Sequence, residues 1–334
     1  MQNIINGLPI AAVILLLAVG FAFLVKGADF FVEGSSSIAK KLKVPPIIIG
    51  LTIVAMGTSL PETAVSVTAS LVQNNELAVS NVVGSNIFNL MFVIGVCSIL
   101  TPIMVQKATV VRDIPLSLGC ALFLLVLGIS GLGDKTGMTL GHADGVIFLI
   151  VFAGYIFTMV RSAMKARAAG QKVEIEGVEE CDNMKELSYG KSILFLIVGA
   201  AAIAFGGDLT VDTASRIAIE LGMSQTLVGL TIVSIGTSLP ELVTSVVAAR
   251  KNEVDMAVGN AVGSNIFNIL MVLGISSAIS PVALIREIII DIVLVMVFSV
   301  MVWIFAGTRK KIERKEGIIM VVVYLIYCAY IIAR

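Results

Sequence analysis

Charged residues are scarce in this sequence. Asp, Glu, Lys and Arg make up 14% of its 334 residues, whereas hydrophobic residues make up 57%. Soluble domains are about 25% charged and about 45–50% apolar. We therefore expect the lipid bilayer to be the solvent. The 23 basic and 23 acidic residues balance to a net charge of zero, which argues against a nucleic-acid partner.

Histidine and cysteine are also in short supply. His142 is the only histidine. The chain therefore lacks the residues for a histidine-rich metal site, and a Ser-His catalytic pair could use only this one histidine. Cys97, Cys120 and Cys328 sit in apolar runs and Cys181 in a polar stretch, a spacing that fits neither a zinc site nor a disulfide framework. We expect no cofactor and no enzyme activity.

Long apolar runs, by contrast, are plentiful. A membrane-spanning helix needs about 20 mostly apolar residues, and flanking residues extend the shorter runs. Ten runs lie near residues 9–25, 46–72, 78–100, 114–132, 146–160, 193–207, 226–248, 256–279, 288–305 and 318–332. The sequence therefore predicts an all-α membrane protein of ten transmembrane helices.

Basic residues are distributed unevenly among the connections. With the N-terminus outside, the inside loops carry eighteen of the 23 Lys and Arg residues. Because cytoplasmic loops carry the excess of basic residues, we expect both termini to be extracytoplasmic. The longest polar stretch, residues 162–190, is then a cytoplasmic linker.

Two motifs occur twice, in the same order. GLTIVAMGTSLPE at 50–62 recurs as GLTIVSIGTSLPE at 229–241, and NVVGSNIFN at 81–89 recurs as NAVGSNIFN at 260–268. Both pairs are 179 residues apart, so the two halves of the chain are a duplication.

The duplication divides the chain into a first repeat, residues 1–161, and a second repeat, residues 191–334. Five predicted spans separate equivalent positions, and an odd number turns the second copy over in the membrane. The sequence predicts two inverted five-helix repeats, an architecture typical of secondary transporters with a site near the midplane.

One acidic residue lies near the middle of the second run of each half, Glu62 and Glu241. A charge at the bilayer centre costs about 2.5–3.5 kcal/mol, and neither run contains Lys or Arg. A bound cation is the natural counter-charge. Pro61 and Pro240 each free the carbonyl four residues back, so helices 2 and 7 are predicted to be broken at this depth.

The neighbours of these carboxylates offer only oxygen. The hydroxyls of Thr58 and Ser59 lie within one turn of Glu62, and the second half repeats them as Thr237 and Ser238. Polar side chains also recur every four residues in the adjacent spans: Asn81, Ser85 and Asn89, and Asn260, Ser264 and Asn268. Such oxygens suit hard cations, for example calcium, magnesium, manganese or sodium.

These motifs resemble the calcium/cation antiporter superfamily, and specifically its prokaryotic sodium/calcium exchangers. The family's repeats correspond to GTSLPE at 57–62 and 236–241, each followed by GSNIFN at 84–89 and 263–268. The large regulatory loop of animal exchangers is missing. The resemblance implies exchange of sodium for calcium by alternating access in the plasma (inner) membrane. In the family, the first helix of each half slides against the bundle.

The resemblance also implies which residues bind each ion. Glu62 and Glu241 would hold calcium together with the carbonyls of Thr58 and Thr237. The sodium sites would share both carboxylates. They would add the side chains of Ser59, Ser85, Asn89, Ser238, Ser264 and Asn268 and the carbonyls of Ala55 and Ser234. Some members carry Asp where this chain has Asn268, so only two carboxylates lie at this centre.

Three other functions fit part of the pattern. A proton-coupled calcium or manganese antiporter would use the same glutamates, although a proton needs no cage of Ser and Asn oxygens. A cation channel also uses acidic rings, but an inverted repeat fits alternating access better. An intramembrane enzyme has the least support, because no nucleophile motif accompanies the two carboxylates.

Overall fold

The structure is a computed structural model that describes residues 5, 7–130, 138–168, 187–223 and 234–333. Eight helices in these ranges are long and apolar enough to cross a membrane. A bent pair, Pro46–Thr58 and Leu60–Leu71, provides a ninth span with a 48° break. The expected span at 226–248 begins outside the described residues, so the described residues contain eight or nine candidate spans and do not test the count of ten.

The first half of the chain contains eight α-helices, three π-helical turns and two strands in the described ranges, counting each side of a break. They are α2 (Ile10–Leu42), α3 (Pro46–Ile49), η1 (Gly50–Val54), α4 (Ala55–Thr58), α5 (Leu60–Leu71), α6 (Asn75–Ile87), η2 (Phe88–Val93), α7 (Ile94–Leu100), β1 (Ile103–Met104), η3 (Thr109–Asp113), α8 (Ile114–Ser130), β2 (Thr139–Leu140), and α9 (His142–Ala168), with residue 5 helical before them.

The described residues of the second half follow a similar order of elements, without a counterpart of η3. They are α10 (Tyr189–Glu220), α12 (Ser234–Gly236), α13 (Leu239–Arg250), α14 (Val254–Phe267), η5 (Asn268–Val272), α15 (Leu273–Ile279), β3 (Val282–Ala283), α16 (Arg286–Arg309), β4 (Lys311–Ile312) and α17 (Arg314–Ala333).

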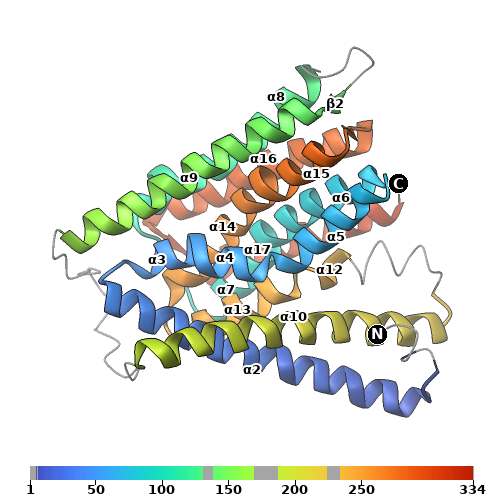
Figure 1. Cartoon of the computed structure of the whole chain (residues 1–334), viewed down its shortest axis with the longest axis horizontal. Coiled ribbons are helices and arrows are strands. Elements are labelled where there is room, and N and C mark those ends of the chain that lie inside the picture. The colour runs from blue at the N-terminus through green and yellow to red at the C-terminus, as the bar shows by residue number, and fades with distance from the viewer. Residues whose placement is uncertain (1–4, 6, 131–137, 169–186, 224–233, 334) are drawn as a thin grey trace.

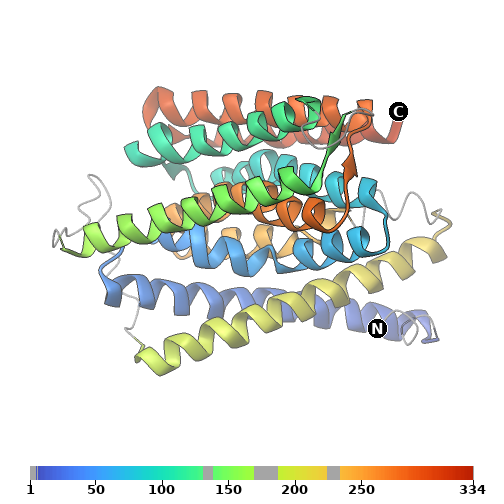
Figure 2. The ribbon, with the colours of Figure 1, turned by 45° about the horizontal axis from the view of Figure 1, so that its top comes forward.

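The helices that carry the duplicated motifs lie at the centre of the bundle (Figure 1). The spans Asn75–Leu100 and Val254–Ile279 are 78% buried, against 22–39% for the other single-helix spans. Apolar residues of both halves, such as Val82 and Val262, pack into one core around them. Helices α8 and α16 lie on the opposite side of this centre from α2 and α10 (Figure 2).

The first helix of each half is much longer than its apolar run. Helix α2 has 33 residues and α10 has 32, because each continues through polar residues on its second half. Asp29 of α2 lies 3.8 Å from the Lys26 ammonium and 3.2 Å from that of Lys251. The Lys251 contact ties α2 to the end of α13.

Helices α2 and α10 pack side by side along glycines (Figure 1). A Cβ atom added to Gly27 would lie 3.0 Å from the Gly199 carbonyl oxygen, and one added to Gly20 would lie 3.2 Å from that of Gly206. Rising numbers on one helix thus meet falling numbers on the other, so the two helices are antiparallel. Glycine permits such close backbone contact.

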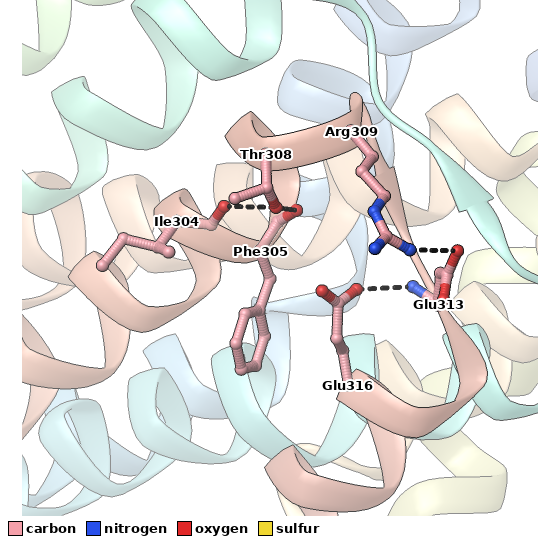
Figure 3. Close-up of polar contacts among 6 residues, drawn as sticks. All are labelled: Ile304, Phe305, Thr308, Arg309, Glu313 and Glu316. Carbon is pink, nitrogen blue, oxygen red and sulfur yellow. Dashed lines mark hydrogen bonds and ion pairs between the residues drawn. The ribbon is translucent and has the colours of Figure 1, made fainter.

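Short strands join the ends of the two halves. β1 pairs with β4 (Ile103 with Ile312), and β3 pairs with β2 (Val282 with Leu140), both antiparallel. Beside β4, the Glu316 carboxylate accepts a 2.7 Å hydrogen bond from the Glu313 backbone N–H at the start of α17 (Figure 3). A carboxylate at this place satisfies an N–H that has no partner within the helix.

The α2–α10 contact leads to a first prediction. Gly27→Leu should force the two backbones apart, since overpacking a close contact costs about 1–3 kcal/mol, and should lower the melting temperature of the purified protein. Gly154→Leu is the matched control, because a Cβ there meets nothing within 4 Å. Equal melting temperatures for the two variants would contradict the close packing.

Candidate cation site

Both central glutamates follow a break in their helix. The first break lies at Ser59, between α4 and α5, and the second at Thr237–Ser238, between α12 and α13. Each following helix opens with a leucine and a proline, and its glutamate lies in the first turn. Neither glutamate is exposed at all. The bend that the prolines predict in helix 2 is confirmed.

The serine hydroxyls beside the breaks reach across to the other half. Ser59 Oγ donates a 2.7 Å hydrogen bond to Glu241 Oε1, and Ser238 Oγ donates a 3.1 Å bond to Glu62 Oε1. The sequence places each serine beside the glutamate of its own motif. The structure instead pairs it with the glutamate of the other repeat, a contact that helical spacing cannot reveal.

Two further serines approach from the neighbouring helices. Ser85 of α6 donates to Glu62 Oε1, and Ser264 of α14 donates to Glu241 Oε1, both at 3.4 Å. Each carboxylate therefore has one oxygen that accepts two hydroxyl bonds, one from each half of the chain.

The threonines before the breaks are held by asparagines of the other half. Thr58 Oγ1 donates to Asn260 Oδ1 at 3.0 Å, and Thr237 Oγ1 donates to Asn81 Oδ1 at 3.2 Å. With these contacts Asn81 and Asn260, the first members of each polar stripe, position the ends of α4 and α12. The Thr58 hydroxyl also lies 3.3 Å from the Ala55 carbonyl.

A pair of asparagines outside the stripe orients the last members of the stripe. Asn89 Nδ2 donates to Asn265 Oδ1, and Asn268 Nδ2 donates to Asn86 Oδ1, both at 3.2 Å. Asn86 and Asn265 also donate to each other's backbone carbonyls. From the sequence alone, packing or helix capping is as good an interpretation of Asn86 and Asn265 as ion binding. The feature of the sequence that could have indicated this role is their position, three residues before Asn89 and Asn268.

Four buried oxygen atoms at this centre have no hydrogen-bond partner among the described residues. They are Glu62 Oε2, Glu241 Oε2, Asn89 Oδ1 and Asn268 Oδ1. Buried polar atoms are nearly always satisfied, so each such atom requires an explanation. Two carboxylate and two amide oxygens are the ligands that a hard cation takes.

The expected backbone ligands near the breaks are the carbonyls of Ala55 and Ser234. The Ala55 carbonyl accepts from the Ser59 N–H at 3.0 Å and is therefore engaged in this conformation. Ser234 is the first residue of α12, and its side chain lies outside the described residues.

A cavity of about 390 Å³ adjoins the second break. Its walls come from α5, α10, α12 and α13, and its lining includes Pro61, Thr237 and Pro240. Asp208 and Asp212 also line it. The sequence favours solvated helix ends for these two acids. Both lie well inside α10, which continues to Glu220, and they line this cavity together with Pro61 and Pro240, the residues that directly precede the glutamates.

Known proteins share this fold and these motifs. The family model described as "Sodium/calcium exchanger protein" matches residues 12–161 and 191–333. A putative antiporter, CaxA, from Alkalimonas amylolytica is 37% identical over 92% of this chain and 95% of its own length. The sodium/calcium exchanger MaX1 from Methanosarcina acetivorans is 33% identical over 94% and 96%.

A solved structure agrees over nearly the whole length. The sodium-calcium exchanger NCX_Mj, soaked with 2.5 mM Na⁺ and 10 mM Sr²⁺, superposes with a TM-score of 0.81 at 32% identity, covering 96% of this chain and 99% of that one. The fold is that of a membrane cation antiporter. The chain belongs to the sodium/calcium exchanger protein family, a family of transporters and not of enzymes.

The two carboxylates can be tested directly. Glu62→Gln and Glu241→Gln should each abolish calcium binding while the protein still inserts, because each change removes a buried negative charge. Loss of one partner of a buried charge pair costs about 3–5 kcal/mol, which is more than about 100-fold in affinity. Radioactive calcium binding to purified protein measures this. Glu76→Gln, on the exposed first turn of α6, is the control and should bind normally.

Proposed function

We propose that this protein exchanges sodium for calcium across the membrane by alternating access. The observation that carries the proposal is the pair of buried glutamates, which are contacted by hydroxyls and each keep one oxygen free. The family supplies the cation-antiport activity. The choice of sodium as the coupling ion is the part that goes beyond it.

Calcium would bind between Glu62 and Glu241, with the carbonyls of Thr58 and Thr237 completing its ligands. Sodium ions would bind to the same carboxylates and to neutral oxygens around them. These come from Ser59, Ser85, Asn89, Ser238, Ser264 and Asn268 and from the carbonyls of Ala55 and Ser234. The free oxygens of both asparagines support this division, since a proton alone would require no such ligands.

Exchange follows because the ions share the two carboxylates. Two negative charges are neutralised by one calcium or by two sodium ions, so the centre cannot hold both sets at once. If the empty site resists the change of access, ion competition becomes coupled antiport. MaX1 and NCX_Mj are both named as sodium/calcium exchangers, which supports the same coupling here.

We further propose ten spans arranged as two inverted repeats. The contacts that support this recur after 179 residues: Ser59 to Glu241 and Ser238 to Glu62, for example. The antiparallel packing of the equivalent helices α2 and α10 also fits inversion. Because these two helices are in close backbone contact, they would move as one unit against the bundle.

The proposed location is the plasma (inner) membrane, with both termini outside and residues 162–190 in the cytoplasm. The basic loops support this orientation. A relative from Escherichia coli, 34% identical over 86% of this chain, is described as an inner membrane protein. In this orientation the cavity beside Thr237 and Asp208 faces the outside.

Calcium uptake into vesicles separates sodium coupling from its rivals. Vesicles loaded with sodium and diluted into sodium-free medium should take up calcium, while an imposed proton gradient alone should drive none. Uptake driven only by the proton gradient would establish proton-coupled antiport instead. Uptake without either gradient would indicate a channel.

The hydroxyls should matter more for sodium than for calcium. Calcium draws most of its binding energy from the carboxylates, whereas a sodium ion depends more on neutral oxygens. Loss of one such contact is worth about 0.5–1.5 kcal/mol. Ser85→Ala and Ser264→Ala should therefore each weaken sodium roughly three- to tenfold, measured as sodium displacement of bound calcium. A fall in calcium affinity with unchanged sodium displacement would show that the assignment is wrong.

A further inference from the structure

The π-helical turn η1 stands directly before the candidate ligands of the first half. The Ala55 N–H, at the end of this turn, donates to the carbonyls of Gly50 and Thr52. It therefore passes over the Leu51 carbonyl, which is its partner four residues back in an α-helix. π-helical turns inside α-helices are frequent at functional sites, and a carbonyl passed over in this way requires another donor.

The donor comes from a different helix. Tyr155 of α9 donates its hydroxyl hydrogen to the Leu51 carbonyl at 3.0 Å, and the tyrosine is only 6% exposed. On another side, Gly263 of α14 packs so closely that an added Cβ would lie 2.7 Å from Leu51 Cα. Leu51 is thus fixed between α9 and α14.

The same tyrosine position exists in the second half. Phe152 packs on Phe267 with ring centroids 5.6 Å apart, and Tyr324 packs on Phe88 at 5.5 Å, both nearly edge-on. Three residues after Phe152 and Tyr324 come Tyr155 and Tyr327, each 6% exposed. Residue 230, the counterpart of Leu51, lies outside the described residues.

We propose that Tyr155 is a positioning residue for ion binding, whose hydroxyl holds the η1 turn and so sets the direction of the Ala55 carbonyl and the Ser59 hydroxyl. An α-helical turn in place of η1 would restore the bond from Ala55 N–H to the Leu51 carbonyl. The additional residue that the π-helical turn accommodates would then join the regular helix. The residues after it would turn by about 100° around the helix axis, which is the angle of one residue in an α-helix. The inference rests on the proposed function.

The two ions depend differently on this turn. Calcium is held mainly by Glu62 and Glu241, and both glutamates follow the breaks, on α5 and α13. The Ala55 carbonyl lies directly after η1 and the Ser59 hydroxyl lies at the break, and both are sodium ligands in the proposal. The Thr58 carbonyl also follows η1, but for calcium it only adds to the two carboxylates. Loosening the turn should therefore weaken sodium more than calcium.

The test compares Tyr155→Phe with Tyr324→Phe in purified protein. Both changes remove one hydroxyl from an equally buried ring, but the Tyr324 hydroxyl contacts Cys328 on its own helix. Calcium affinity, the sodium concentration that displaces half of the calcium, and the melting temperature without ions are measured for each.

Tyr155→Phe should raise the half-displacing sodium concentration roughly three- to tenfold, the effect of one lost hydrogen bond, with calcium affinity changed less than about twofold. Tyr324→Phe should change neither. If Tyr155→Phe lowers the melting temperature and weakens both ions equally, or leaves sodium unchanged, the positioning role is wrong. If sodium does not displace calcium from the wild-type protein, the proposed function is refuted, and this inference with it.

Discussion

Two carboxylates buried at the centre of a membrane bundle set the conditions for the rest of the structure. Glu62 and Glu241 are removed from water, and the hydrogen bonds that the described side chains of other residues donate to them come from hydroxyls. Neutral hydrogen bonds cannot balance two negative charges in this environment. In the proposed function, a mobile cation supplies the missing positive charge, and it can be exchanged because it is not covalently part of the chain.

The halves of the chain build this site together. Each glutamate accepts one hydroxyl from its own half and one from the other, and asparagines on α6 and α14 link the two central helices. Neither half could assemble a complete site alone. The helix breaks also serve this purpose, because they bring Ser59 and Ser238 close enough to cross between halves. Outside this centre, α2 and α10 contact each other through glycines.

Sequence patterns predicted the helical membrane fold, the bend before Glu62 and the gathering of polar residues at one place. They could do so because the costs of burying charge and of placing proline inside a helix are local properties. The exchange of serines between halves, the role of Asn86 and the contact from Tyr155 to Leu51 depend on how distant helices meet. Helical spacing carries no information on such contacts. The apolar run also did not predict the full length of α2, because the helix continues beyond that run through a polar segment that contains Asp29.

Sodium competition for a single calcium site is the central claim, and equilibrium calcium binding to purified protein tests it most directly. Calcium is titrated at several fixed sodium concentrations and constant pH. We expect sodium to weaken calcium binding steeply, with more than one sodium ion displacing each calcium, while the maximum amount bound stays the same. Calcium that remains bound at saturating sodium and leaves only on acidification would contradict it.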